Sequence, residues 1–408
     1  MACPAKNFMN VRVAQVSTVK DAARLISATG ADPCSVAAMA SKAVARAVYI
    51  ESIDNRAANI IKQEMLSLGG EAAVSKDVSV FKKAVSDVAV FGTLRQLGLL
   101  TDKLSRQPFG LKLTAAAVVR TLCNYESVNF SFCCGSRKLA MGSRPLVMGI
   151  LNVTPDSFSD GGKFDDPKRA VEHAFSMLEQ GADFIDVGGE STRPGARPVS
   201  PKEEIRRIVP VISAITRRAK ALVSVDTYKP DVARAALDAG ACIVNDITGL
   251  RHGNGAMARV VNRYKAGTII MHMQGTPRTM QKSPHYRDVA GDIIKFLNER
   301  IAFAGQNGIG AEQILVDPGI GFGKTLEHNC AILRRLAEFK VTGRPIVVGA
   351  SRKSFLGAIL AGAPADKRRE GSIASALAAY AGGACVLRVH DVKETVQALA
   401  VAAAIYAH

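Results

Sequence analysis

The chain of 408 residues contains no tryptophan, and aromatic residues make up only 5% of it. It also shows no ribonucleoprotein, zinc-finger or helix-turn-helix motif that would organise its net charge of +17 for nucleic-acid binding. The basic clusters at Arg206, Arg217 and Lys367 fall in or beside predicted helices, where solvated helix faces account for them. We therefore expect small anionic molecules as partners, and no nucleic acid.

Paired cysteine motifs and long apolar runs are missing as well. The eight cysteines are scattered without CxxC or Cys/His metal spacing, which is typical of reduced thiols in a cytoplasmic protein. No apolar run approaches the roughly 20 residues needed to cross a bilayer, so we expect no membrane partner. Residues 1–50 contain only two acids and weakly resemble a transit peptide, but Asn10–Val16 reads equally well as a strand, and we favour the strand.

What the sequence does contain, from Arg144 onward, is a regular alternation of strand-like and helix-like segments. The expected strands are Leu146–Val153, Phe184–Gly189, Leu222–Thr227, Ile243–Ile247, Thr268–Met273, Ile314–Asp317, Pro345–Ser351 and Ala384–His390. The expected helices are 166–180, 202–219, 230–239, 255–264, 288–306, 326–338, 370–382 and 392–406. Eight β/α units in about 265 residues predict a (β/α)8 TIM barrel over residues 144–408. An open doubly wound sheet is the alternative, but it would concentrate ligand contacts at one switch point, and here polar residues end nearly every strand.

The first third of the chain predicts a smaller α/β domain, residues 1–135, in front of the barrel. Its expected strands are Asn10–Ser17 and Asp87–Gly92, and its expected helices are Val19–Thr29, Arg56–Leu68 and Leu94–Ser105. The stretch Asn129–Ser143 has turn residues and weak periodicity, so it is the candidate boundary.

Acids and amides follow the apolar strands at several points. Asp226, Asn245 and Asp317 each come at a strand end, where a buried polar group needs a partner, and a nitrogen-rich heterocycle would supply one. An ordinary helix N-cap explains either acid taken singly, Asp226 or the Asp246 that follows Asn245. Because all strands of a barrel end on the same rim, we expect these side chains to meet in one pocket.

Basic groups follow the strands in the same way. Arg193, in a Gly-rich turn, offers a planar fork of donors for phosphate or carboxylate, although a surface arginine in a Gly-Pro turn explains it about as well. Lys353, Arg388 and His390 add positive charge that would neutralise a diphosphate leaving group. The Gly323-Lys324-Thr325 run imitates a Walker A tail, but Pro318 stands where that motif needs glycine, so we reject a nucleotide triphosphatase.

Taken in order, these motifs resemble those of dihydropteroate synthase over roughly residues 144–408. The matching segments are Asn152-Val-Thr-Pro-Asp-Ser-Phe-Ser-Asp-Gly-Gly, Glu190-Ser-Thr-Arg-Pro-Gly, Ser224-Val-Asp-Thr, Asn245-Asp, Asp317-Pro-Gly, Ser351-Arg-Lys and Arg388-Val-His. The N-terminal third is the departure, because the compact members of this family lack it. We hold two hypotheses for it, a scaffold that stabilises or dimerises the barrel and a small-ligand domain.

The resemblance implies a reaction. The methylene carbon of a dihydropterin diphosphate ester is transferred to the amine of 4-aminobenzoate, which gives dihydropteroate for folate biosynthesis, with Mg2+ accompanying the diphosphate. The diphosphate leaves first, so no protein nucleophile is required. The resemblance also suggests a homodimer.

Residue roles follow from the same resemblance. The pterin would be bound by Asp226, Asn245, Asp317, Phe322 and Lys353. The diphosphate would be contacted by Thr192, Arg388 and His390, with Arg388 also able to stack on the pterin ring, and Asn152 would help to hold Mg2+. The aminobenzoate, and sulfonamides competing with it, would lie against Phe158, Asp160, Arg193, Pro194 and Ser351. Catalysis would depend on Asp226, Lys353, Arg388 and His390.

Two rivals remain open at this point. A pterin-dependent methyltransferase resembles the barrel and its pterin-binding acids but should lack the diphosphate-binding residues. A catalytically silent pterin-binding module would not need Lys353, Arg388 and His390 intact.

Overall fold

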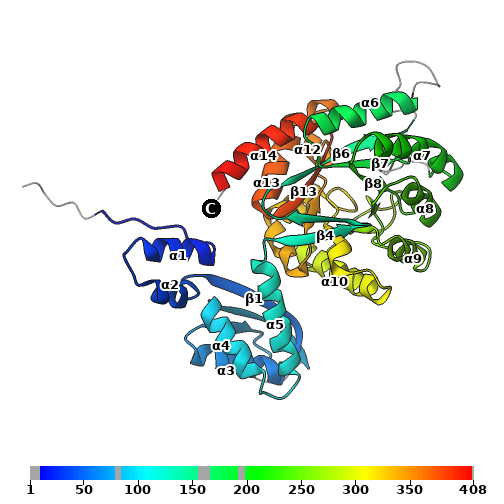
Figure 1. The fold of residues 1–408 in the computed structure, drawn as a ribbon. Helices are drawn as coiled ribbons and strands as arrows, with labels where there is room; N and C mark the ends of the chain where they lie inside the picture. Colours follow the sequence, from blue (N-terminus) through cyan, green and yellow to red (C-terminus); the bar gives the residue numbers. More distant parts are fainter. Residues whose placement is uncertain (1–9, 79–83, 155–165, 192–197, 407–408) are drawn as a thin grey trace, which may run out of the picture. The chain divides into compact units, whose positions relative to one another are not determined.

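The computed structural model describes residues 10–78, 84–154, 166–191 and 198–406. It divides into two compact units, one extending to Cys123 and the other beginning at Asn124 (Figure 1). The division lies before the predicted boundary at 129–143, and the reason is a β-hairpin described below.

The first unit is a three-stranded antiparallel sheet with helices. Its strands are β1 (Ala45–Asp54), β2 (Glu71–Val74) and β3 (Val85–Thr93), in the order β1-β3-β2. Its helices are α1 (Val19–Ser27), α2 (Pro33–Ala40), α3 (Asn55–Ser67), α4 (Leu94–Leu104) and α5 (Leu111–Glu126). Ile61 and Met65 of α3 pack with Leu97 and Leu100 of α4 in a core of its own.

The predicted strand at Asn10–Ser17 is wrong. These residues form no regular element, and Val11 and Val13 are 79% and 100% exposed. The segment has the composition of a strand, but no neighbouring strand pairs with it. The strand that the sequence reading missed, β1 (Ala45–Asp54), pairs with β3 along nearly its full length. Strand formation depends on a hydrogen-bonded neighbour, which local composition does not reveal.

The second unit contains the predicted barrel. Eight parallel strands close in the order β10-β11-β12-β13-β6-β7-β8-β9. They are β6 (Leu146–Asn152), β7 (Phe184–Gly188), β8 (Leu222–Asp226), β9 (Ile243–Asp246), β10 (Gly267–Met271), β11 (Ile314–Asp317), β12 (Ile346–Val348) and β13 (Ala384–Val389). All eight lie within or close to the expected segments, and closure occurs where β13 pairs with β6.

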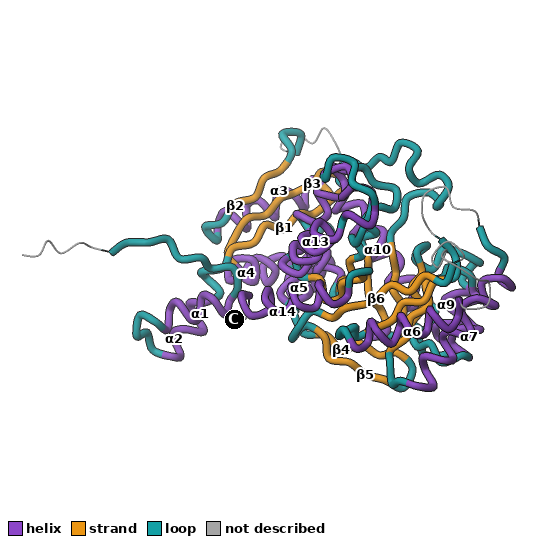
Figure 2. Tube along the Cα trace, turned by 90° about the horizontal axis from the view of Figure 1, so that it is seen from above, coloured by secondary structure: helices purple, strands orange, loops and turns teal. Residues whose placement is uncertain are grey.

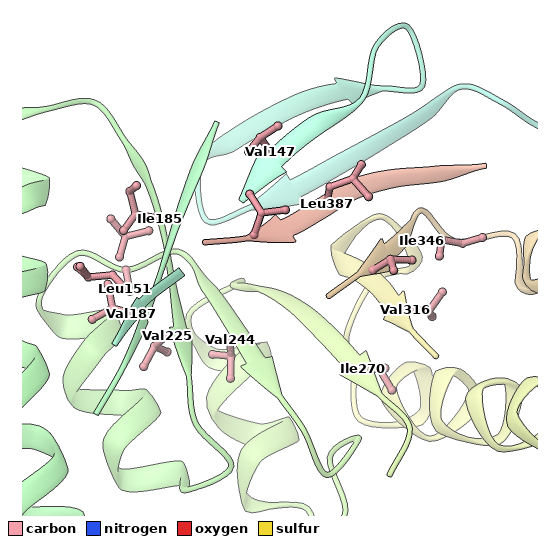
Figure 3. Packing of buried hydrophobic residues seen from close by; sticks show 14 of the residues in the cluster. Val147, Leu151, Ile185, Val187, Val225, Val244, Ile270, Val316, Ile346 and Leu387 are labelled. Carbon is pink, nitrogen blue, oxygen red and sulfur yellow. The ribbon is translucent and has the colours of Figure 1, made fainter. Parts of the chain in front are cut away.

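Helices surround the strands (Figure 1). They are α6 (Asp166–Glu179), α7 (Pro201–Arg218), α8 (Pro230–Asp238), α9 (Ala256–Arg263), α10 (Val289–Gln306), α11 (Leu326–Arg334), α12 (Ser354–Ile359), α13 (Arg369–Ala381) and α14 (Val392–Tyr406), with 3-10 turns at Ala311–Gln313, Leu336–Thr342 and Ala365–Lys367. Apolar strand residues such as Val187, Val225 and Val316 belong to the largest buried cluster (Figure 3). In the described part of the chain, no helix has both the length and the apolar character needed to cross a membrane.

The candidate boundary, Asn129–Ser143, contains a β-hairpin of β4 (Phe130–Cys134) and β5 (Arg137–Met141) (Figure 2). Phe132 is fully buried in one cluster with Leu146 and Phe184, which begin β6 and β7. The turn is held to the barrel by a hydrogen bond from Gly135 N to Lys265 O, 2.8 Å long. The hairpin therefore covers the amino-terminal mouth of the barrel, away from the strand ends that carry the polar residues.

We expect Phe132→Ala to lower the free energy of unfolding of the barrel unit by about 3–5 kcal/mol, the usual cost of removing a buried phenylalanine ring. Ser131→Ala, an exposed neighbour on the same strand, is the matched control and should change it by less than about 0.5 kcal/mol. Urea unfolding followed by circular dichroism measures both. Equal stability of the two variants would mean that the hairpin is not part of the barrel core.

Candidate active site

The carboxyl ends of the barrel strands surround a cavity of about 610 Å3. Its wall is formed by Ile150, Asn152, Thr154, Ser191, Asp226, Met280, Gly321, Phe322, Gly349, Ser351, Arg352, Lys353, Ser354, Ala365, Arg368, Arg388 and His390. Residues more than 200 positions apart meet here because every parallel strand of a closed barrel ends on the same rim.

A bridge of two acids and one arginine joins three strands at this cavity. Arg388 of β13 donates from Nε to Asp186 Oδ2 at 2.6 Å and from its terminal NH2 nitrogen to Asp226 Oδ2 at 2.8 Å. Asp186 of β7 is fully buried, and the Asp226 side chain at the end of β8 is 10% exposed. Two of the three guanidinium nitrogens are thereby committed, and the plane of the group is held at the carboxyl end of the barrel.

Each acid of the bridge has one carboxylate oxygen that is not bonded to Arg388. Asp186 Oδ1 and Asp226 Oδ1 are buried and have no hydrogen-bond donor among the described residues. Burial raises the pKa of Asp226, and the charges of Asp186 and Glu204 add to the effect, while Arg388 and Lys353 oppose it. A buried acceptor left unpaired is costly, and Asp226 lines the cavity, so its unpaired oxygen is suited to accept a donor from a ligand.

Asn245 and Asp317 lie next to this bridge. Asn245 on β9 is buried, and its Nδ2 donates to Asp186 Oδ2 at 3.0 Å. Asp317, at the end of β11, accepts from Gly319 N at 2.6 Å. Burial raises the pKa of Asp317, although the nearby charge of Lys353 opposes the shift. Gly319 has φ +72°, and a Cβ there would lie 1.9 Å from His272 O, so the turn after Asp317 requires glycine.

Lys353 reaches the same cavity from the residue before α12. Its Nζ donates to Ile320 O and lies 4.4 Å from the centre of the Phe322 ring. Burial lowers the pKa of Lys353 to about 8, with Asp317 and Asp226 opposing the shift. Gly321 leaves room for the lysine stem, because a Cβ on Gly321 would lie 2.9 Å from Lys353 Cδ.

A hydroxyl and an imidazole form the other side of the cavity. Ser351 Oγ lies 3.0 Å from His390 Nδ1 and accepts from His390 N at 3.2 Å. Arg388 of β13 and His390, the residue after that strand, both line the cavity. Arg352, between Ser351 and Lys353, has φ +56° and is held in place by an ion pair with Asp391.

The structure brings most of the predicted site residues together. Those that line the cavity are Asn152, Asp226, Phe322, Ser351, Lys353, Arg388 and His390. Asn245 and Asp317 are both buried at strand ends of the same rim, where Asn245 bonds to Asp186 of the bridge and Asp317 to Gly319 N. Phe158, Asp160, Thr192, Arg193 and Pro194 lie outside the described residues.

Sequence reasoning gave no role to Asp186, although it anchors both Arg388 and Asn245. Its signal was an acid inside an otherwise apolar strand, Phe184–Gly188, which is a position that demands a buried partner. A second missed group is the buried Lys324, whose Nζ lies 3.1 Å from His272 Nδ1 and donates to Phe322 O at 2.9 Å. Burial lowers the pKa of both side chains, and the contact supports the loop that carries Phe322.

Asn152 is the residue predicted to hold the metal, and it lies within the described part of the chain. It ends β6, is half-buried, and lines the cavity with its amide. The described residues include no group of three or more His, Cys, Asp or Glu side chains able to hold a metal ion. One amide oxygen suits Mg2+ that takes its other ligands from substrate phosphates and water.

Comparison with known proteins gives the family. The model of the pterin-binding enzyme family matches residues 148–390. Dihydropteroate synthase from Escherichia coli (strain K12) is 50% identical over 259 residues, which are 64% of this chain and 91% of that protein. The structure of Xanthomonas albilineans dihydropteroate synthase in complex with 7,8-dihydropteroate is similar with a TM-score of 0.62 and 41% identity, over 68% of this chain and 99% of that one.

A further relative extends past the barrel. A probable bifunctional folylpolyglutamate synthase/dihydropteroate synthase from Haloferax volcanii is 40% identical over 397 residues, covering 95% of this chain. This chain spans 46% of that protein. The similarity therefore includes most of the N-terminal unit as well as the barrel. The strand ends, the cavity and these relatives agree that the chain belongs to the pterin-binding enzymes, and among them to the dihydropteroate synthases.

Proposed function

We propose that the cavity condenses (7,8-dihydropterin-6-yl)methyl diphosphate with 4-aminobenzoate to give 7,8-dihydropteroate and diphosphate. The observation that carries the proposal is the unpaired, buried oxygen of Asp226 beside the cations of Arg388 and Lys353. A pterin edge combines an amino group and ring N–H donors with a carbonyl acceptor. The acids would accept from those donors, and Lys353 would donate to the carbonyl.

Asn245 and Asp317, at the ends of β9 and β11, would complete pterin binding. Asp317 keeps one carboxylate oxygen besides the one bonded to Gly319 N, and it can accept from the ligand. Phe322 supplies an apolar surface next to Lys353 Nζ for a flat ring. Burial makes each of these contacts stronger than it would be in water, because displaced water no longer competes.

The two ion pairs of the bridge limit which N–H groups of Arg388 can bind the diphosphate. Its Nε–H and one N–H of a terminal nitrogen are bonded to Asp186 and Asp226, so three of its five N–H donors are left to meet a diphosphate. The fixed guanidinium plane is better suited to stack on the pterin ring. His390 and Ser351 offer donors at the rim, and Thr192 is proposed to add its hydroxyl.

The reaction breaks the bond between the methylene carbon and the bridging oxygen, and the electron pair leaves with diphosphate. The amine nitrogen of 4-aminobenzoate then forms the new C–N bond with its lone pair and loses a proton, which diphosphate or water accepts. Arg388 and His390 stabilise the leaving group while charge develops on it. Lys353 and the acids hold the pterin in place through both steps.

Asn152 is proposed to hold Mg2+ together with the diphosphate oxygens. When bound, the ion would offset part of the diphosphate charge.

The second substrate is proposed to enter above the pterin. Its carboxylate would lie near Ser351 and the backbone of the following turn, where Ser351 Oγ is within reach of His390. Arg193, Pro194, Phe158 and Asp160 are proposed to surround its ring. Sulfonamides, which imitate 4-aminobenzoate, should then compete for this position.

The methyltransferase and the silent pterin-binding module are weaker hypotheses for a physical reason. A methyltransferase or a silent pterin binder has no use for donors placed around a leaving group, yet Arg388 and His390 both line this cavity. A homodimer and a cytoplasmic location are further proposals. The second is supported by the seven described cysteines, which are all free thiols, as expected in a reducing compartment.

The purified chain should release diphosphate and form dihydropteroate when it is supplied with both substrates and Mg2+. Omitting 4-aminobenzoate should abolish product formation. An Asp317→Ala variant should have strongly reduced activity, because the N–H donors of the pterin lose the carboxylate that accepts from them. Product is measured by chromatography. If pterin binds but no diphosphate is released with both substrates present, a silent binder or a methyltransferase becomes the better assignment.

Asp317→Asn should stabilise the free protein while weakening pterin binding. The folded pKa of Asp317 is raised above its ordinary value, so its ionisation costs stability that grows as the pH rises through the folded pKa. A neutral amide removes that cost and can still accept from Gly319 N. At neutral pH we expect a higher Tm, and pterin affinity lower by about 10–100-fold. Thermal unfolding and calorimetric titration measure the two effects, and a lower Tm would contradict the argument.

Pterin affinity should fall as the pH rises above about 8. The pKa of Lys353 is lowered to about 8 in the free site, so the ammonium donor is present below that pH and is lost above it. Lys353→Met should bind pterin more weakly and lose this part of the pH dependence. Titrations from pH 7 to 9 with both proteins test the point. The same pH profile in both would assign the titration to another group.

A further inference from the structure

The loop that follows β11 is bonded to the rest of the barrel through its own carbonyl groups. Glycine occupies positions 319, 321 and 323 of this loop, so its backbone has little stiffness of its own. The four consecutive peptide oxygens of residues 320–323 nevertheless each accept a hydrogen bond from a side chain. The donors, in that order, are Lys353 Nζ, Gln281 Nε2 at 2.9 Å, Lys324 Nζ at 2.9 Å and Tyr286 OH at 2.7 Å. The conformation of the loop therefore depends on these contacts.

Lys324 is the buried member of this set of donors, with only 3% of the residue exposed. Besides its bond to Phe322 O, its Nζ lies 3.1 Å from His272 Nδ1. Burial lowers the pKa of Lys324 well below its ordinary value and the pKa of His272 to about 2, and so favours the uncharged form of both groups. An uncharged amine has two N–H groups, and the carbonyl and the neutral imidazole nitrogen provide one acceptor for each.

A packing role alone does not explain a lysine at position 324. A methionine would have a similar length without an amine to remove from water, and removing an amine from water costs free energy. What the lysine adds is its bond to the peptide of Phe322. That residue, Gly321 and Lys353 all line the cavity. The centre of the Phe322 ring lies 4.4 Å from Lys353 Nζ, which in turn donates to Ile320 O.

We propose that Lys324 is a positioning residue, which holds the Phe322 peptide and so sets where the Phe322 ring and Lys353 Nζ lie in the cavity wall. Both groups depend on the loop, because the ring belongs to the held residue and Lys353 is bonded to the carbonyl two residues before it. The loop from β11 to α11 lies entirely within the described residues. The step from this wall to a ligand rests on the proposed function, which places a pterin against Phe322.

The variants have to separate positioning from folding. Lys324→Met removes both N–H groups while nearly keeping the length of the side chain. Phe132→Ala is the matched control for lost stability, since Phe132 packs in the cluster at the opposite mouth of the barrel and Phe322 packs in another. The chain contains no tryptophan, so Phe322→Trp introduces a single indole into the loop as a reporter. Quenching of its fluorescence by acrylamide measures how firmly the loop is held, and it needs no substrate.

We expect Lys324→Met to lower pterin affinity about tenfold, because the released peptide no longer holds the ring and Lys353 in place. In the Phe322→Trp background, the same change should raise the acrylamide quenching constant at least about twofold. Phe132→Ala should leave both values within about 1.5-fold, although it lowers Tm. Calorimetric pterin titration, fluorescence quenching and thermal unfolding supply the readouts.

Affinity is measured without the reporter, so it still decides the proposal if Phe322→Trp does not fold. The proposal is overturned if Lys324→Met binds pterin as tightly as the parent, or if Phe132→Ala changes quenching and affinity as much as Lys324→Met does. If quenching rises as expected but the parent chain binds no pterin, the proposed function fails and the role of Lys324 in the cavity wall stands.

Discussion

The buried bridge Asp186–Arg388–Asp226 is the constraint on which the site depends. It joins β7, β13 and β8 across the carboxyl end of the barrel, and two carboxylates share one guanidinium there. Such a bridge is stable only while all three members stay, because removing one leaves a buried charge without its partner. The bridge also leaves one oxygen of each acid unpaired, and of the two acids it is Asp226 that lines the cavity.

The remaining site follows from this charge arrangement. Asp226 and Asp317 are buried at an energetic cost, which is visible in their raised pKa values, and Lys353 is buried with its pKa lowered. Acidic and basic side chains are thus buried at a cost in free energy, and a ligand with complementary hydrogen-bonding groups reduces that cost. Unsatisfied polar groups are expensive in a folded protein, and active sites are where they persist. The barrel tolerates them because its apolar clusters, including the hairpin at the opposite mouth, supply the stability.

The N-terminal unit has an apolar cluster and a sheet of its own. Among the described residues, the cluster around Ile61 and Leu97 contains residues of this unit alone, and the sheet is antiparallel where the barrel is parallel. The similarity of 95% of this chain to part of a probable bifunctional Haloferax volcanii protein means that a relative contains most of this unit as well. The hairpin at Phe130–Met141, by contrast, is part of the barrel unit, although it precedes the first barrel strand.

The sequence by itself determined the barrel and most of its rim. Alternation of apolar strands and amphipathic helices is a local property, so eight strands could be predicted, along with Asp226, Lys353, Arg388 and His390 at their ends. Local composition could not reveal which strands find partners, and so the segment Asn10–Ser17 was wrongly predicted as a strand, and the hairpin within the candidate boundary was not predicted. Only the tertiary structure decided how the polar residues pair. Asp186 pairs with Arg388, and Lys229 pairs with Glu190 and Glu204. Those pairings join residues far apart in the chain, and they form only when barrel closure brings the strand ends together.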